Sequence, residues 1–315
     1  MNSAFHTQAI VFESPQQLAL STLALNAPAQ ADVVVEIDWS GISTGTEKLL
    51  WTGDMPSFPG MGYPLVPGYE SVGQVVHAGP ASGRRVGESV FVPGSNGFVA
   101  ARGLFGGAAR RVVLPGARTL SIDAQLAERG VLLALAATAQ HALAMATQVP
   151  QLIVGHGVLG RMVARLAVIA GGSPVVWDTQ PQRRTGALGY EVLDPGTDTR
   201  RDYTSICDVS GDSALLDTLI SRLSSGGEVV LAGFYHQPLS FAFAPAFMRE
   251  ARLQVAAQWQ PADLLAVRGF IDNGRLSLDG LITHHSDAVD ADAAYRTAFG
   301  DPACLKMVLN WRDCA

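Results

Sequence analysis

The chain has 315 residues, of which 48% are hydrophobic and 16% are charged, and its formal net charge at pH 7 is −6. At roughly 150 residues per domain, this length favours two domains with enough apolar side chains for real cores. An acidic balance without a basic face excludes nucleic acid as an expected partner. The three cysteines are far apart in the sequence. They therefore favour neither a disulfide framework nor a structural zinc site.

The N-terminal segment shows no basic stretch followed by an apolar one, so no signal peptide is expected there. The most apolar stretch, residues 131–139, is about half the length that a bilayer requires. We therefore expect a cytoplasmic protein without a transmembrane segment.

The residue composition and the hydrophobic pattern of the sequence change near residue 123. Residues 9–116 are short β-branched or alternating runs separated by Gly and Pro, which is typical of a β domain. Residues 123–148 are rich in Ala and Leu and predict one or two helices. Short apolar strands then alternate with helical patterns, at 152–154, 175–177, 206–209, 229–232 and 253–256. This alternation predicts an α/β fold, a doubly wound parallel sheet of the Rossmann type.

A glycine motif follows the first of these strands. The strand runs into Gly-His-Gly-Val-Leu-Gly and then into an apolar helix, with Arg161 and Arg165 on its opposite side. In such a motif the first glycine allows the tight turn, the second lets the backbone approach a pyrophosphate, and the third lets helix and strand pack closely. The free amides at the helix N-terminus attract the anion. The expected cofactor-binding residues here are Gly155, His156, Gly157, Val158, Leu159 and Gly160.

An acidic residue closes the second strand, since Asp178 lies eighteen residues after Gly160. A carboxylate at this place binds ribose hydroxyls and repels a 2′-phosphate, so NAD is the expected cofactor. Arg183 and Arg184 follow closely and offer either a contact to the cofactor or a solvated helix start. Residues after later strands are expected on the nicotinamide side, with a turn acceptor as the alternative for the first of them: Asp208, Ser210, Gly233 and Phe234.

The order of several motifs resembles the medium-chain dehydrogenase/reductase superfamily, the zinc alcohol dehydrogenase-like enzymes. The similarity runs through residues 40–47, 67–70, 87–93, 155–160, 225–233 and 281–284. This resemblance implies a GroES-like catalytic domain over residues 1–122, completed by 273–315, and a linking helix with a Rossmann domain over 123–272. It also implies a homodimer through an edge strand, which residues 253–256 would supply.

The chain departs from the zinc-dependent members of that superfamily at every expected ligand. Ser43 stands where those enzymes have Cys, and Tyr69 where they have His. Residues 132–139, where a third ligand would fall, offer only Leu, Ala and Thr. Hydroxyl groups are poor ligands for zinc at neutral pH. The departures therefore predict a zinc-free branch without a metal site.

The loop over residues 51–70, together with this zinc-free layout, resembles the bacteriochlorophyllide dehydrogenase branch of the superfamily. That resemblance implies NAD-dependent oxidation of the C3 1-hydroxyethyl group of a tetrapyrrole, a bacteriochlorophyllide, to an acetyl group. Apolar loop residues suit a large flat substrate. They suit equally well a small core under the loop. These residues are Trp51, Met55, Phe58, Met61 and Tyr63.

Without a metal, another group must handle the proton of the alcohol. Tyr69 replaces a metal ligand, so we expect its phenol to act as the acid or base, with Ser43 and Thr44 completing a hydroxyl relay. Lys48 is expected to lower the pKa of the phenol. The alternative is that Tyr69 only fills the space of the missing metal.

Two further residues are candidates for catalysis. Glu47 is the alternative acid at the site. His141, on the linking helix, is either a catalytic residue or a packed histidine. Two rival functions stay open at this point: an NAD(P)H-dependent quinone or enoyl reductase, which Asp178 disfavours, and a dinucleotide- and pigment-binding protein without catalysis.

Overall fold

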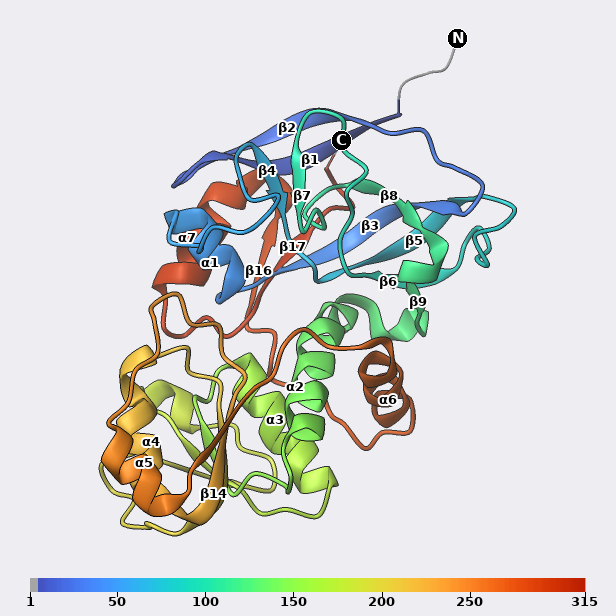
Figure 1. Cartoon of the computed structure of the whole chain (residues 1–315). Coiled ribbons are helices and arrows are strands. Elements are labelled where there is room, and N and C mark those ends of the chain that lie inside the picture. Colours follow the sequence, from blue (N-terminus) through green and yellow to red (C-terminus); the bar gives the residue numbers. More distant parts are fainter. Residues whose placement is uncertain (1–4, 315) are drawn as a thin grey trace. The chain divides into compact units, whose positions relative to one another are not determined.

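The computed structural model describes residues 5–314, which form two compact units (Figure 1). Within the described range, one unit comprises residues 5–133 and 282–314, and the other comprises residues 134–281. The first four residues of the N-terminal segment discussed above lie outside the described range. Over the described residues, no helix has the length and apolar character needed to cross a bilayer.

The first unit is built on a sheet with the strand order β16-β17-β3-β5-β6-β9, in which β8 also pairs with β3. The long strand β3 owes its extended form to a run of valines that is buried in the sheet. Ile42 at its end lies opposite Met307 of β17, so the C-terminal segment returns to the N-terminal one. The bounds are β3 (Asp32–Ile42), β5 (Ser71–Ala78), β6 (Ser89–Val92), β8 (Arg111–Pro115), β9 (Leu120–Ser121), β16 (His284–Asp287) and β17 (Met307–Asn310).

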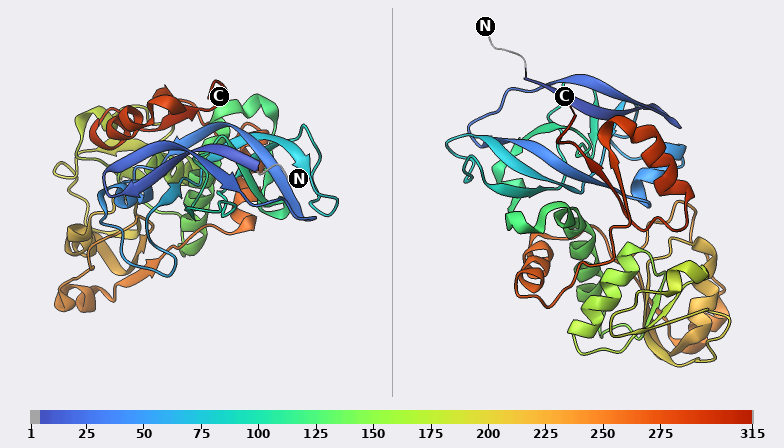
Figure 2. Two further views of the ribbon diagram at one scale, coloured as in Figure 1. Left: turned by 90° about the horizontal axis from the view of Figure 1, so that it is seen from above. Right: turned by 180° about the vertical axis from the view of Figure 1, so that it is seen from behind.

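A smaller sheet with the order β2-β1-β4-β7 completes this unit. Its strands are β1 (Phe5–Ser14), β2 (Gln17–Leu25), β4 (Leu65–Pro67) and β7 (Arg102–Leu104), and its helices are α1 (Thr46–Thr52) and α7 (Ala291–Gly300). In Figure 2, α7 lies beside the strands of this sheet. The core between them holds Phe12, with Trp51 at 5.4 Å and Tyr295 at 5.3 Å between ring centroids. The 3-10 segments are Gly116–Arg118, Ala124–Leu132 and Ala288–Asp290.

The second unit is the expected doubly wound sheet. Its six parallel strands have the order β12-β11-β10-β13-β14-β15, which confirms the predicted fold class. The strands are β10 (Leu152–Val154), β11 (Val175–Trp177), β12 (Glu191–Leu193), β13 (Tyr203–Asp208), β14 (Leu223–Leu231) and β15 (Arg252–Val255). The helices are α2 (Leu133–Met145), α3 (Val158–Ile169), α4 (Leu216–Arg222), α5 (Phe243–Arg249) and α6 (Pro261–Asp272). Short 3-10 turns lie at Pro181–Arg184 and Ser213–Leu215.

The unit boundaries fall about ten residues after the expected ones. The segment Ala124–Leu132 packs against β3, β5 and β6, so it belongs to the first unit. Residues 277–279 are tied to the second unit because Arg165 of α3 donates hydrogen bonds to the carbonyl oxygens of Ser277 at 2.8 Å and Asp279 at 3.0 Å.

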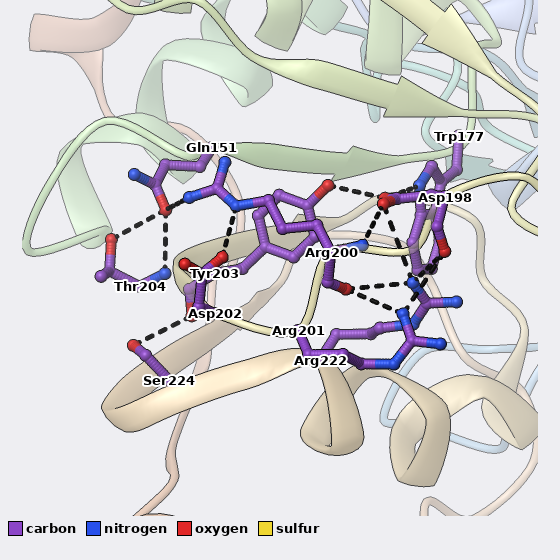
Figure 3. A network of polar contacts seen from close by, with 10 residues as sticks. All are labelled: Gln151, Trp177, Asp198, Arg200, Arg201, Asp202, Tyr203, Thr204, Arg222 and Ser224. Atoms are coloured by element: carbon purple, nitrogen blue, oxygen red, sulfur yellow. Dashed lines mark hydrogen bonds and ion pairs between the residues drawn. The ribbon is translucent and has the colours of Figure 1, made fainter.

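A polar network orders the irregular stretch between β12 and β13 (Figure 3). One carboxylate oxygen of Asp198 accepts hydrogen bonds from the indole of Trp177 at 2.8 Å and from the phenol of Tyr203 at 2.6 Å. The guanidinium of Arg222 lies 4.9 Å from the centre of the Trp177 ring. The network thereby fixes the end of β11, where the acidic residue Asp178 follows.

Candidate functional site

The glycine loop of the second unit has the backbone geometry that a pyrophosphate site requires. Gly155 follows β10 with a φ of +101°, a conformation that strains residues with a Cβ. A Cβ on Gly160 would lie 1.8 Å from the carbonyl oxygen of Gly155, so the helix packs this close to the loop only with glycine. A Cβ on Gly157, the N-cap of α3, would have open space around it. The open side of this loop can therefore receive a ligand close to its backbone.

The N-terminus of α3 supplies donors for an anion. The amide of Arg161 makes the first hydrogen bond of the helix, to the carbonyl oxygen of Gly157 at 3.0 Å. The amides of Val158, Leu159 and Gly160 precede it and have no acceptor within the helix. They carry the positive end of the helix dipole, which suits a pyrophosphate.

Asp178 lies beside this loop with its carboxylate oriented by backbone donors. Its two oxygens accept hydrogen bonds from the amide of His156 at 2.9 Å and from the amide of Gln180 at 2.8 Å. Each oxygen keeps a lone pair for a ribose hydroxyl. Arg184 forms an ion pair with Asp194. The residues of the second unit thus fit the adenosine and pyrophosphate of a dinucleotide.

The imidazole of His156 is engaged by two groups of the protein. It is buried, and its two nitrogens contact the carbonyl oxygen of Arg183 at 2.5 Å and the phenol of Tyr190 at 2.8 Å. Arg161 and Arg165 lie opposite the apolar side of α3, as the periodicity indicates, but they are only 4% and 5% exposed. Residues 183–186 pack over Arg161, and residues 277–279 pack over Arg165. Helical periodicity alone does not predict that other segments bury these side chains.

The residues expected on the nicotinamide side lie at the end of β13 or follow β13 and β14. The carboxylate of Asp208 accepts hydrogen bonds from the hydroxyl of Ser210 at 2.7 Å and from the phenol of Tyr235 at 2.8 Å. This geometry matches the turn-acceptor alternative for Asp208. A Cβ on Gly233 would lie 2.7 Å from a backbone nitrogen, and Phe234 is exposed.

In the first unit, Ser43 and Tyr69 come together. Ser43 follows β3 and Tyr69 follows β4, and their hydroxyl oxygens are 2.7 Å apart. Thr46 also forms a hydrogen bond with the phenol, a contact that the sequence did not indicate. Desolvation and the charge of Glu70 raise the pKa of Tyr69 above its ordinary value. The phenol therefore keeps its proton at neutral pH.

Glu47 is buried next to this hydroxyl pair. Its carboxylate oxygens accept hydrogen bonds from the amide of Ser43 at 3.0 Å and from the phenol of Tyr295 at 2.7 Å. Desolvation raises the pKa of Glu47 to about 7 despite these two donors. Ser43 thus links the two groups, since its hydroxyl contacts Tyr69 and its amide contacts Glu47.

A second buried carboxylate, Glu70, pairs with Lys306. The ammonium group lies 2.6 Å from one oxygen of Glu70 and also donates to the carbonyl oxygen of Ile42 at 3.0 Å. The other oxygen of Glu70 is buried without a hydrogen-bond partner. Neither Lys306 nor Tyr295 was predicted, because both lie more than 200 residues from their partners in the sequence.

Other candidates of the first unit lie elsewhere. The ammonium group of Lys48 donates to the carbonyl oxygen of Phe299 at 3.2 Å, and burial and Glu70 together raise the pKa of Tyr69. The expectation that Lys48 lowers this pKa is therefore wrong, because burial dominates and raises it. Thr44 is exposed.

In the second unit, His141 contacts a carboxylate oxygen of Asp263 at 2.9 Å through its Nδ1 atom. This contact matches the alternative of a packed histidine on the linking helix.

The apolar loop residues divide into two groups. Trp51 and Met55 are buried in the core of the first unit, which matches the packing alternative for them. Met61 and Tyr63 are partly buried against the same core, and the phenol of Tyr63 donates to the carbonyl oxygen of Leu50. Phe58 is exposed. Of the five, Phe58 presents the most side chain to a ligand.

The side-chain atoms at the expected metal position are poor ligands for zinc. Hydroxyl oxygens stand at positions 43 and 69, and they are bonded to each other. Within residues 5–314, no three His, Cys, Asp or Glu side chains gather closely enough to hold a metal ion.

Comparison with known proteins shows the family of the chain. Residues 29–124 match the alcohol dehydrogenase GroES-like domain. The chain is 59% identical to the 2-desacetyl-2-hydroxyethyl bacteriochlorophyllide A dehydrogenase of Cereibacter sphaeroides, over 98% of this chain and 99% of the relative. It is 58% identical to the enzyme of the same name from Rhodobacter capsulatus, with the same coverage of both chains.

Solved structures share the fold at low identity. L-Idonate 5-dehydrogenase from Escherichia coli superimposes with a TM-score of 0.85 at 18% identity, over 97% of this chain and 98% of the other. The 2R,3R-butanediol dehydrogenase from Bacillus subtilis gives a TM-score of 0.83 at 18% identity, over 96% and 99% of the two chains.

Proposed function

We propose that this chain oxidises the C3 1-hydroxyethyl group of a bacteriochlorophyllide to an acetyl group. The chain belongs to the medium-chain dehydrogenase family, as do the two bacteriochlorophyllide dehydrogenases named above. The observation that carries the proposal is the 59% identity over 98% of the chain, together with a glycine loop and an acidic residue that fit a dinucleotide. Oxidation of the secondary alcohol removes a hydride and a proton. Bound NAD would accept the hydride.

We assign NAD rather than NADP to the second unit. Asp178 is held in place by two backbone amides, and its negative charge would repel a 2′-phosphate. Arg184 is engaged by Asp194, so its charge is already compensated. These contacts favour a ribose with a free 2′-hydroxyl.

The proton of the alcohol is assigned to the hydroxyl pair of the first unit. Because the phenol of Tyr69 keeps its own proton, it can take the substrate's proton only while it passes its own to a hydroxyl bonded to it, that of Ser43 or Thr46. Thr46 is half-buried, so its hydroxyl can release a proton to solvent. Glu47 contacts the main-chain amide of Ser43, so on this proposal it positions Ser43 and takes no proton from its hydroxyl.

This chemistry would proceed without zinc. In metal-dependent relatives a cation stabilises the developing alkoxide. Here the protonated phenol would donate a hydrogen bond to the same oxygen, and the donors at positions 43 and 69 do not suit a metal.

We also propose that two copies associate through the second unit. β15 is an edge strand of the sheet, and the preceding helix α5 exposes 73% of Phe243, 65% of Phe247 and 74% of Met248. An open strand edge beside so large an apolar surface is typical of an interface. Sedimentation equilibrium should give a dimer, and Phe247→Asp should give a monomer; a monomeric wild type would refute this part.

The test is an absorption time course with NAD and 3-(1-hydroxyethyl) bacteriochlorophyllide a. NADH and the long-wavelength pigment band are recorded together, because a conjugated acetyl group shifts that band to the red. The proposal predicts that both signals change at the same rate. Pigment binding without NADH formation would support a non-catalytic binding protein. Oxidation of NADPH by a quinone, with an inert pigment, would support a reductase.

A further inference from the structure

Three side chains of the second unit link the glycine loop to residues 181–190, of which His156 and Arg161 are buried and Tyr190 is half-buried. We call His156, Arg161 and Tyr190 the adenosine clamp. The Nδ1 atom of His156 lies 2.5 Å from the carbonyl oxygen of Arg183, and its Nε2 atom lies 2.8 Å from the phenol oxygen of Tyr190. The main-chain amide of His156 donates to Asp178. One residue of the loop therefore orients both the ribose-binding acid and the segment that follows it.

The contacts fix the chemical form of His156. A carbonyl oxygen only accepts hydrogen bonds, so Nδ1 carries the hydrogen and Nε2 accepts from the phenol of Tyr190. Desolvation lowers the pKa of His156 to about 4, and the charge of Arg161 acts in the same direction. The imidazole is thus neutral at physiological pH. It holds its two hydrogen-bond partners in place and does not act as an acid or a base.

Arg161 makes the second half of the adenosine clamp. Its guanidinium donates hydrogen bonds to four carbonyl oxygens, those of His156 at 3.1 Å, Arg183 at 3.0 Å, Thr185 at 2.8 Å and Gly186 at 3.2 Å. A Cβ on Gly186 would lie 2.5 Å from this guanidinium, so the segment approaches this closely only with glycine. Because these hydrogen bonds all go to backbone carbonyl oxygens, Arg161 stabilises the conformation of the backbone over residues 183–186.

We infer that the adenosine clamp is a positioning device that sets the preference for NAD over NADP, an inference that rests on the dinucleotide site proposed above. The clamped segment carries Arg183 and Arg184, the two cations nearest in sequence to Asp178. His156 and Arg161 hold the backbone of this segment, and Arg184 is paired with Asp194. The segment therefore keeps a conformation in which Asp178 lies next to the 2′-hydroxyl of the adenosine ribose. Once released, the segment can turn its guanidinium groups toward a 2′-phosphate.

The test measures dissociation constants of NADH and NADPH for the full-length protein, by the fluorescence of the reduced cofactor. His156→Phe keeps a ring but removes both nitrogen contacts. It should weaken NADH binding about tenfold, the loss expected from buried hydrogen bonds, and weaken NADPH binding less. His156→Gln should restore the wild-type preference, because its amide can donate to the carbonyl and accept from the phenol. His77→Phe makes the same change at an exposed site of the first unit and should leave both constants unchanged.

The outcomes separate this inference from the proposed function. A wild type that fails to bind NADH would overturn the dinucleotide site itself. A wild type that prefers NADH, with a His156→Phe variant that loses affinity for both cofactors by the same factor, would overturn the adenosine clamp alone. If His156→Phe does not fold, Tyr190→Phe takes its place, since it removes the donor to Nε2 together with the hydroxyl contact to Arg165. Tyr190→Phe should narrow the NADH preference severalfold, and an unchanged preference would overturn the inference.

Discussion

Replacing Glu47 by Gln should stabilise the protein at high pH and have little effect at low pH. The fold raises the pKa of this carboxyl to about 7 because burial disfavours its charged form. The folded protein therefore holds the proton more tightly than the unfolded chain does. Its stability falls as pH rises from about 4.5 to 7, the interval in which only the unfolded chain loses the proton. Glutamine carries no charge, so the variant does not bear this cost.

The magnitude follows from the two pKa values. A difference between 4.5 in the unfolded chain and about 7 in the fold, at 1.36 kcal/mol per unit, amounts to about 3 kcal/mol once both forms are ionised. The glutamine amide can keep the geometry, since its oxygen can accept from the Ser43 amide and its nitrogen can donate to the Tyr295 hydroxyl. We expect the variant to gain about 3 kcal/mol over the wild type at pH 8.5 and almost nothing at pH 4.

Urea unfolding of both proteins at a series of pH values measures this difference directly. Taking the difference between variant and wild type cancels the titration of all other groups. Glu13→Gln, at an exposed position of β1, is the matched control and should give a flat difference. A flat difference for Glu47→Gln as well, or one that falls with pH, would refute the burial argument.

The remaining predictions concern both units. Tyr69→Phe should lower kcat about 100-fold while the Kd of NADH stays unchanged, and full turnover would refute the relay. Lys306→Met should cost about 3 to 5 kcal/mol in urea unfolding because it leaves the Glu70 carboxylate buried without a counter-charge; a loss under about 1 kcal/mol would contradict this. Gly157→Ala should unfold like the wild type but bind NADH at least about tenfold more weakly, whereas Gly160→Ala should unfold at lower urea because its Cβ meets a backbone oxygen. Normal NADH binding by the first variant, or normal stability of the second, would contradict the geometry of the loop.

Much of the second unit was predictable from local patterns. Five of its six strands follow from apolar runs, while β12 was missed because Glu191–Leu193 is a short strand at the sheet edge without a fully buried residue. The geometry of the glycine turn and the place of Asp178 beside it were predictable because both depend on backbone conformation close in sequence. Burial of Arg161 was not, because the irregular segment that covers it has no periodicity.

The site of the first unit shows the opposite case. The pairing of Ser43 with Tyr69 could be expected because both replace ligand positions of a known family, although the residues alone gave no distance. Lys306 and Tyr295 reach Glu70 and Glu47 only because β17 and α7 return to the N-terminal strands. Local sequence carries no signal for such a return. Yet the return of β17 brings Lys306 to Glu70 and so sets the charge balance of the site.

The central claim is that the alcohol is oxidised without a metal ion. It is tested most directly by treating the protein with a chelator, measuring its metal content by mass spectrometry, and following NADH formation from NAD and the hydroxyethyl pigment in the same sample. The account predicts undiminished turnover when the zinc content is far below one ion per chain, and no gain when zinc is added. Turnover that disappears with the metal and returns in proportion to added zinc would contradict it.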